Sequence, residues 1–212
     1  MTTANRLIQN CNRALGLCVF LLFALPSPLT ALHASPLPEE KTWHLLIEPK
    51  FMHPEVSFPI PQAERTVYVP GYLQDGEPVY FTKAEFDQIH LSFDQFLEKS
   101  RTNSSENKVT AKFVRTSKQI IAYALLQSES PLMATAVFAP DFIEKFKNLL
   151  GEKLIVAIPN RNTIFVFPAE TSDYRDYAAQ VLEIYKESAH PVSVEVFEIS
   201  KTGLRTVGIY EP

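Results

Sequence analysis

Very short links between strand-like runs are the feature that most restricts what this chain can fold into. Four links of two or three residues join pairs of apolar or alternating runs, at 75–76, 116–118, 160–162 and 201–203. A parallel crossover needs a dozen or more residues, so each pair is predicted to form an antiparallel hairpin. Because helical patterns lie between the hairpins, the sequence predicts an α+β fold, a mostly antiparallel sheet with three to four helices packed on it.

The strand-like runs differ in how buried they should be. The expected strands are 43–47, 65–73, 77–81, 110–115, 119–126, 154–159, 163–168, 192–199 and 204–210. The runs 154–159 and 163–168 are almost continuously apolar, which is typical of central strands covered on both faces. Four prolines between 49 and 61 exclude a regular ladder there, so that stretch is expected to be a wrapped connection.

Two capping boxes predict where the first helices begin. Thr82 stands three residues before Glu85, and Ser92 stands three residues before Gln95. In this arrangement the two side chains satisfy each other's backbone amides, so a short helix and one of about ten residues are expected here.

Apolar stripes predict two later helices. One follows Pro140 and is expected to end at Gly151, which accepts the backbone geometry of a helix end. The longest is expected over 173–188 with Ser172 as its N-cap, burying Val181 and Leu182 against the sheet.

The first 34 residues resemble a secretory leader. Arg6 and Arg13 precede the apolar run 14–25, and prolines and small residues follow. A helix of twelve residues rises about 18 Å, against a hydrocarbon layer of roughly 30 Å, so no permanent membrane span is expected. We therefore predict a bacterial signal peptide over 1–34 and an exported product, periplasmic or extracellular.

The rest of the chain is predicted to be one domain. Residues 35–40 are polar and proline-rich and are expected to form a flexible tail. A single α+β domain is expected over 41–212, and the polar run 100–108 divides it into an N-terminal lobe, 41–103, and a C-terminal lobe, 109–212.

Composition excludes several classes of function. The chain has 20 Lys and Arg against 24 Asp and Glu and no basic block, so nucleic-acid binding is not expected. Both cysteines, Cys11 and Cys18, lie in the predicted leader, which leaves the exported chain without thiols, disulfides or thiolate metal sites. Glycines and histidines are scattered, so no cofactor and no metal site are predicted.

Catalytic motifs are equally hard to find. The sequence has no G-x-S-x-G, so no nucleophile is assigned and no catalytic residue is proposed. Glu195 and Glu198 are acidic and near one another, but three residues apart on a strand they point to opposite faces. A solvated or edge location is the expectation for both.

The second half of the chain has an ordered series of elements that resembles a known family. It runs from SPLMATAVF (130–138) through the helix APDFIEKFKNLLGE and the hairpin LIVAIPNRNTIFVFP to a closing hairpin opened by HPVSVEVFEI. This series resembles the YtpQ-like family of uncharacterised bacterial proteins, a domain of unknown function. The family tends to place an aspartate where Asn162 stands here. The resemblance implies a fold and no activity.

Tyrosines of the first hairpin are the main candidates for a binding surface. Alternation places Tyr68 and Tyr72 opposite the face of Val67 and Val69, and Tyr80 of the partner strand is expected to join the two tyrosines. Such a patch suits recognition of a protein, a peptide or a glycan. The alternative is that a helix or the proline-rich segment covers the three rings.

Arg161 is the other candidate for ligand binding. It lies in the 160–162 link, where it reads first as an exposed turn residue between two asparagines.

The function predicted from these features is an exported, non-catalytic binding or interaction module with an unknown protein, peptide or glycan partner. The alternative, from a different class, is a hydrolase acting on an envelope or extracellular polymer, with a site assembled from dispersed His, Ser and acidic residues. The two differ in whether a histidine is hydrogen-bonded to both a nucleophile and a carboxylate.

Overall fold

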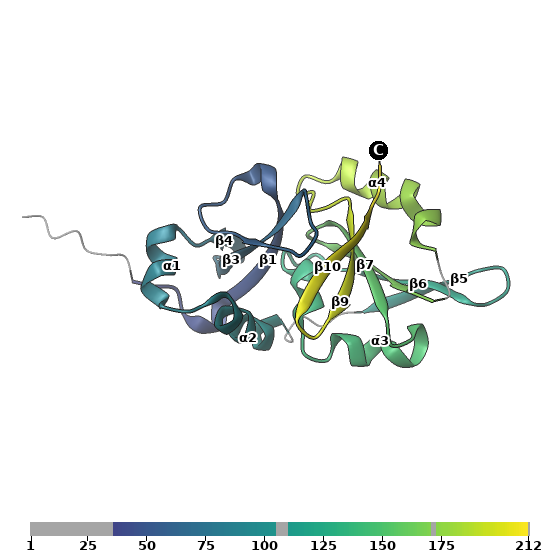
Figure 1. The fold of residues 1–212 in the computed structure, drawn as a ribbon, viewed down its shortest axis with the longest axis horizontal. Helices are drawn as coiled ribbons and strands as arrows, with labels where there is room; N and C mark the ends of the chain where they lie inside the picture. Colours follow the sequence, from purple (N-terminus) through teal and green to yellow (C-terminus); the bar gives the residue numbers. More distant parts are fainter. Residues whose placement is uncertain (1–35, 105–109, 171–172, 212) are drawn as a thin grey trace, which may run out of the picture. The chain divides into compact units, whose positions relative to one another are not determined.

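Two antiparallel sheets and the helices packed on them make up the fold (Figure 1). The computed structural model describes residues 36–104, 110–170 and 173–211. The α+β class predicted from the short links is therefore confirmed. The predicted signal peptide and the predicted N-cap Ser172 lie outside the described residues.

The first sheet is built around a long central strand. Its order is β1-β3-β2, and β4 also pairs with β3, so β3 has β1 on one side and both β2 and β4 on the other. Asp75 and Gly76 have φ values of 53° and 86°, which gives the β3–β4 hairpin the tight turn predicted from Asp-Gly. The strands are β1 (Trp43–Pro49), β2 (Phe58–Pro59), β3 (Thr66–Gln74) and β4 (Glu77–Tyr80).

The second sheet joins three hairpins in the order β10-β9-β7-β8-β6-β5. The hairpin β7–β8 lies in the middle, and every residue of β8 is buried, as its continuous apolar sequence predicts. The strands are β5 (Ala111–Arg115), β6 (Ile121–Gln127), β7 (Leu154–Asn160), β8 (Thr163–Pro168), β9 (Glu195–Ser200) and β10 (Gly203–Ile209).

The first two α-helices begin where the local sequence predicts. Thr82 and Glu85 form a full capping box at the start of α1, and Ser92 and Gln95 exchange the same two contacts at the start of α2. The helices are η1 (Glu40–Thr42), η2 (Lys50–Met52), α1 (Lys83–Ile89), α2 (Phe93–Ser104), η3 (Met133–Phe138), α3 (Phe142–Leu150), η4 (Tyr174–Tyr177) and α4 (Ala178–Glu187). No helix in this described part of the chain is long and apolar enough to cross a membrane.

The long helix expected over 173–188 is divided into two parts. Its first turn is the 3-10 helix η4, whose start is capped by the side chain of Asp173, and the α-helical part α4 begins only at Ala178. Val181 and Leu182 of α4 are buried, as predicted.

One large apolar core unites the two sheets. Trp43 of β1 stacks on Phe96 of α2, with ring centroids 5.8 Å apart, and both belong to the same cluster as Val156 of β7 and Phe197 of β9. Helix α4 covers the opposite face of the second sheet through a separate cluster. Residues 36–212 accordingly form one compact unit.

Candidate functional site

The register of the β3–β4 hairpin separates the three tyrosines. Gly71 lies opposite Tyr80, and Tyr72 lies opposite Val79. Directly paired residues share a face of a sheet, so Tyr80 is on the opposite face from Tyr68 and Tyr72. The predicted single patch of three tyrosines is therefore wrong.

Tyr68 belongs to the core. Its hydroxyl accepts a hydrogen bond from the backbone amide of Leu204 at 2.7 Å, and its ring stacks on Phe93 at 5.5 Å. Burial raises the pKa of Tyr68 to about 12. Tyr72, half-buried on the same face, packs on Phe81 with a centroid distance of 4.9 Å. Both rings thus contribute packing between elements rather than an open surface.

Tyr80 joins a buried ion pair between the two sheets. Nη2 of Arg161 lies 2.7 Å from Oε1 of Glu48 and donates to the Tyr80 hydroxyl at 3.1 Å. That hydroxyl also interacts with the Glu48 carboxylate, which opposes the rise in the pKa of Glu48. Arg161 is therefore not the exposed turn residue that the sequence suggests, because it reaches from the β7–β8 turn to β1.

Burial governs the electrostatics of this cluster. The side chain of Glu48 is only 3% exposed and that of Arg161 16%. Burial raises the pKa of Glu48, although Arg161 and Tyr80 both oppose the shift, and burial raises the pKa of Tyr80 to about 12. The cluster consequently acts as a structural tie whose two charges satisfy each other.

Glu195 is a second buried carboxylate, which corrects the expectation of a solvated edge position. It is 2% exposed, and its Oε1 accepts hydrogen bonds from the backbone amides of Glu64 at 2.6 Å and Arg65 at 3.2 Å. Its Oε2 has no partner within the described part of the chain. Glu195, in the second sheet, therefore fixes the loop that leads into β3 of the first.

The histidines lie in unrelated surroundings. His44 is buried, which lowers the pKa of its imidazole to about 4, and its Nδ1 bonds nothing within the described segments. No histidine side chain there hydrogen-bonds a hydroxyl or a carboxylate, and no three His, Cys, Asp or Glu residues of those segments gather closely enough to hold a metal ion.

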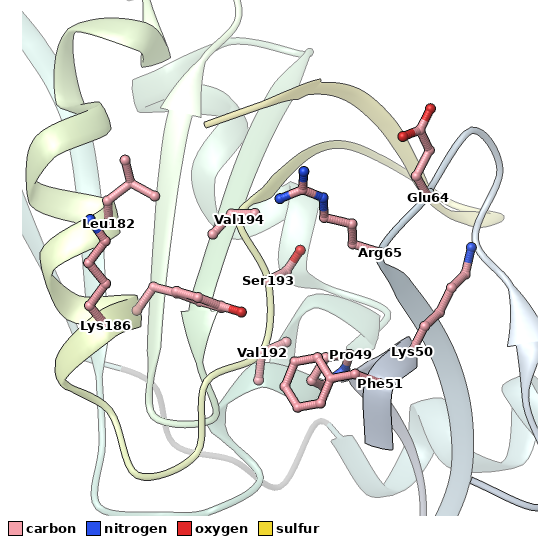
Figure 2. A pocket seen from close by; sticks show the side chains of 11 residues that line it. Pro49, Lys50, Phe51, Glu64, Arg65, Leu182, Lys186, Val192, Ser193 and Val194 are labelled. Carbon is pink, nitrogen blue, oxygen red and sulfur yellow. The ribbon is translucent and has the colours of Figure 1, made fainter. Parts of the chain in front are cut away.

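An apolar groove of about 400 Å³ is the best candidate for a binding site (Figure 2). It lies between the end of β1 with η2, the loop before β3, helix α4 and the segment that leads into β9. Its lining residues are Pro49, Lys50, Phe51, Glu64, Arg65, Leu182, Tyr185, Lys186, Val192, Ser193 and Val194. The volume is at the lower end of the range typical of small-molecule sites.

The groove combines an apolar floor with a polar rim. Figure 2 shows the ring of Phe51 turned toward Val192, and the guanidinium of Arg65 reaching across toward Val194. Phe51 is 59% exposed, which is unusual for so large an apolar side chain and leaves its ring free to contact a ligand.

No local sequence pattern predicts the groove, because its four walls are far apart along the chain. The one local indication of a binding surface is the pair Phe51 and Met52. These two large apolar residues lie inside a proline-rich connection, and both are exposed. Comparison of the chain with protein-family models, with curated proteins and with solved structures finds no match in any of the three.

Proposed function

We propose that the protein is an exported, non-catalytic binding module that holds a small apolar ligand in the groove beside Phe51. The observation that supports this most directly is the groove, whose surface is mainly apolar, with the exposed ring of Phe51 beside it. Burying apolar surface is the main driving force for such binding, at about 25 cal/mol per Å².

Export is the second part of the proposal. It rests on Arg6, Arg13 and the apolar run 14–25, which have the order of a secretory leader. Fractionation of a bacterial host with N-terminal sequencing should find a mature species that starts near Leu32 or Ser35. Full-length chain confined to the cytoplasm would contradict this part.

The resemblance to the YtpQ-like family is compatible with a binding module and supplies no activity. No observation favours the hydrolase alternative over it, since the histidines of the described segments make none of the side-chain contacts that such a site requires.

Nile red, a neutral apolar dye, tests the groove. The expressed protein should bind it saturably, with a rise in fluorescence. Phe51→Ala removes one wall and should weaken binding roughly fivefold, which corresponds to about 1 kcal/mol for a ring that is only partly covered.

Ile120→Ala is the matched control, because Ile120 is 50% exposed and belongs to the β5–β6 turn rather than to the groove. Absence of saturable binding, or equal loss in both variants, would show that the groove is not a binding site.

A further inference from the structure

The rim of the groove carries an excess of positive charge. Lys50, Arg65 and Lys186 face one acid, Glu64, in a chain whose net charge is −4. Within the described residues neither Arg65 nor Lys186 forms an ion pair, and Lys50 donates to the backbone carbonyl of Ala63 at 3.0 Å. The charge around this opening therefore complements an anion.

Arg65 is the cation best placed to bind that anion. Its guanidinium reaches over the groove, whereas Figure 2 shows Lys50 and Lys186 extending along the outer edges. The backbone amide of Arg65 donates a hydrogen bond to the carboxylate of Glu195 at 3.2 Å, and the neighbouring amide of Glu64 donates to the same carboxylate at 2.6 Å. Glu195 thus fixes the backbone under Arg65, and the guanidinium has no ion-pair partner among the residues that the structure describes, so its donor fork is open to an anion.

The floor favours a hydrocarbon chain over a peptide. A peptide brings backbone N–H and C=O groups that need partners when buried. The hydroxyl of Ser193, one of the polar groups that line the groove, is already 2.7 Å from Oγ1 of Thr66 and accepts from the amide of Glu195 at 2.9 Å. An alkyl chain needs no such partner.

We infer that the groove binds a free alkyl carboxylate, with its carboxylate on the guanidinium of Arg65 and its unbranched tail along Phe51 and Val192. This inference rests on the proposed function, since it names the ligand class of the same groove. A planar guanidinium offers two parallel N–H donors to a carboxylate, which neither an alcohol nor an ammonium group can accept in the same way.

Displacement of Nile red measures the preference for the head group. Octanoate, decanoate, decanol and decyltrimethylammonium are compared below the concentrations at which they form micelles. Decanoate should displace the dye at a concentration at least about tenfold lower than decanol, because hydrogen bonds to charged groups are the stronger ones. Each added methylene should improve displacement about fourfold until the groove is filled.

Variants of Arg65 then identify the charge responsible. Arg65→Gln should remove the preference for decanoate over decanol, and Arg65→Lys should restore part of it. Arg115→Gln is the matched control, because Arg115 is exposed on the distant β5–β6 hairpin, and it should leave the preference unchanged.

Different failures have different meanings. If Nile red binds but decanol displaces it as well as decanoate does, the carboxylate inference is wrong while the proposed function stands. The inference is equally overturned if Arg115→Gln acts like Arg65→Gln, or if a peptide with an apolar residue at its free C-terminus displaces the dye better than decanoate. If Nile red itself does not bind, the proposed function fails first.

Discussion

Replacing Arg161 by Met should destabilise the protein strongly, because it breaks a buried ion pair. In the wild-type protein Nε and Nη2 of Arg161 lie 3.0 Å and 2.7 Å from the same carboxylate oxygen of Glu48. Met fills similar space without charge. Glu48 would then be a buried carboxylate with only the Tyr80 hydroxyl beside it.

The magnitude follows from the burial of the pair. Glu48 is 3% exposed, so its charge has almost no access to water once the guanidinium is gone. Breaking a buried pair by removing one partner costs about 3 to 5 kcal/mol, whereas an exposed pair contributes about 0 to 1 kcal/mol. Arg175→Met is the matched control, because Arg175 and Asp173 form an ion pair that is exposed on both sides.

The loss should depend on pH in a defined direction. Burial already raises the pKa of Glu48 above its ordinary 4.5, so the folded protein holds this proton more tightly than the unfolded chain does, and stability falls as pH rises through that region. Without Arg161, one of the influences that lower the pKa of Glu48 disappears and this pKa rises further. The penalty of Arg161→Met should therefore be larger at pH 8 than at pH 4.5, which lies below the raised pKa of Glu48.

Urea unfolding at several pH values measures this effect. A loss below about 1 kcal/mol at pH 8, or a loss equal to that of Arg175→Met, would show that the pair is not the buried tie described here. A penalty that grows on acidification would refute the assignment of the effect to the Glu48 carboxylate.

Three further outcomes test other parts of the fold by the same unfolding assay. Tyr68→Phe should cost about 1 to 3 kcal/mol, because it leaves the buried amide of Leu204 without its acceptor, whereas Tyr72→Phe should be nearly neutral. Leu182→Ala should cost about 2 to 5 kcal/mol, and an unchanged midpoint would contradict the burial of that face of α4. His44 has its pKa lowered to about 4 by burial, so the unfolded chain takes up its proton first as pH falls below 6.5 and stability is lost between 6.5 and 4. His44→Leu should therefore lose less stability than wild type over that interval, and an equal loss would assign the effect to other groups.

Local rules predict much of the fold. The Asp75-Gly76 turn, the two capping boxes and the apolar stripes each depend on residues within one or two turns of the chain, and the structure contains all of them. A local rule of the same kind, the register set by the length of the turn, also predicts the face on which Tyr80 lies. With a two-residue turn, Gln74 pairs with Glu77, and counting outward pairs Gly71 with Tyr80. The shared face expected for the tyrosines is thus a register error of one residue.

The buried carboxylates and the groove have no local signature. Glu48 and Arg161 are 113 residues apart, and Glu195 is 130 residues from Arg65. In sequence Glu195 resembles any solvated acid at the start of a strand, and only the arrival of the 64–65 loop provides amides that compensate its burial.

Glu48 and Glu195 each connect the two sheets, one from the first sheet and one from the second, and both connections adjoin the groove. Glu48 on β1 holds Arg161 of the second sheet and directly precedes Pro49, while Glu195 on β9 holds the amide of Arg65. Replacing a buried ion pair by apolar residues of similar volume is often neutral or stabilising, so stability alone does not explain the first tie. We expect its directional contacts to set the orientation of the groove walls. The double variant Glu48→Met with Arg161→Leu should therefore have a free energy of unfolding, measured in urea, within about 1 kcal/mol of wild type. It should still bind Nile red more weakly than wild type does. Wild-type affinity for the dye in a variant of wild-type stability would show that apolar packing alone positions the walls.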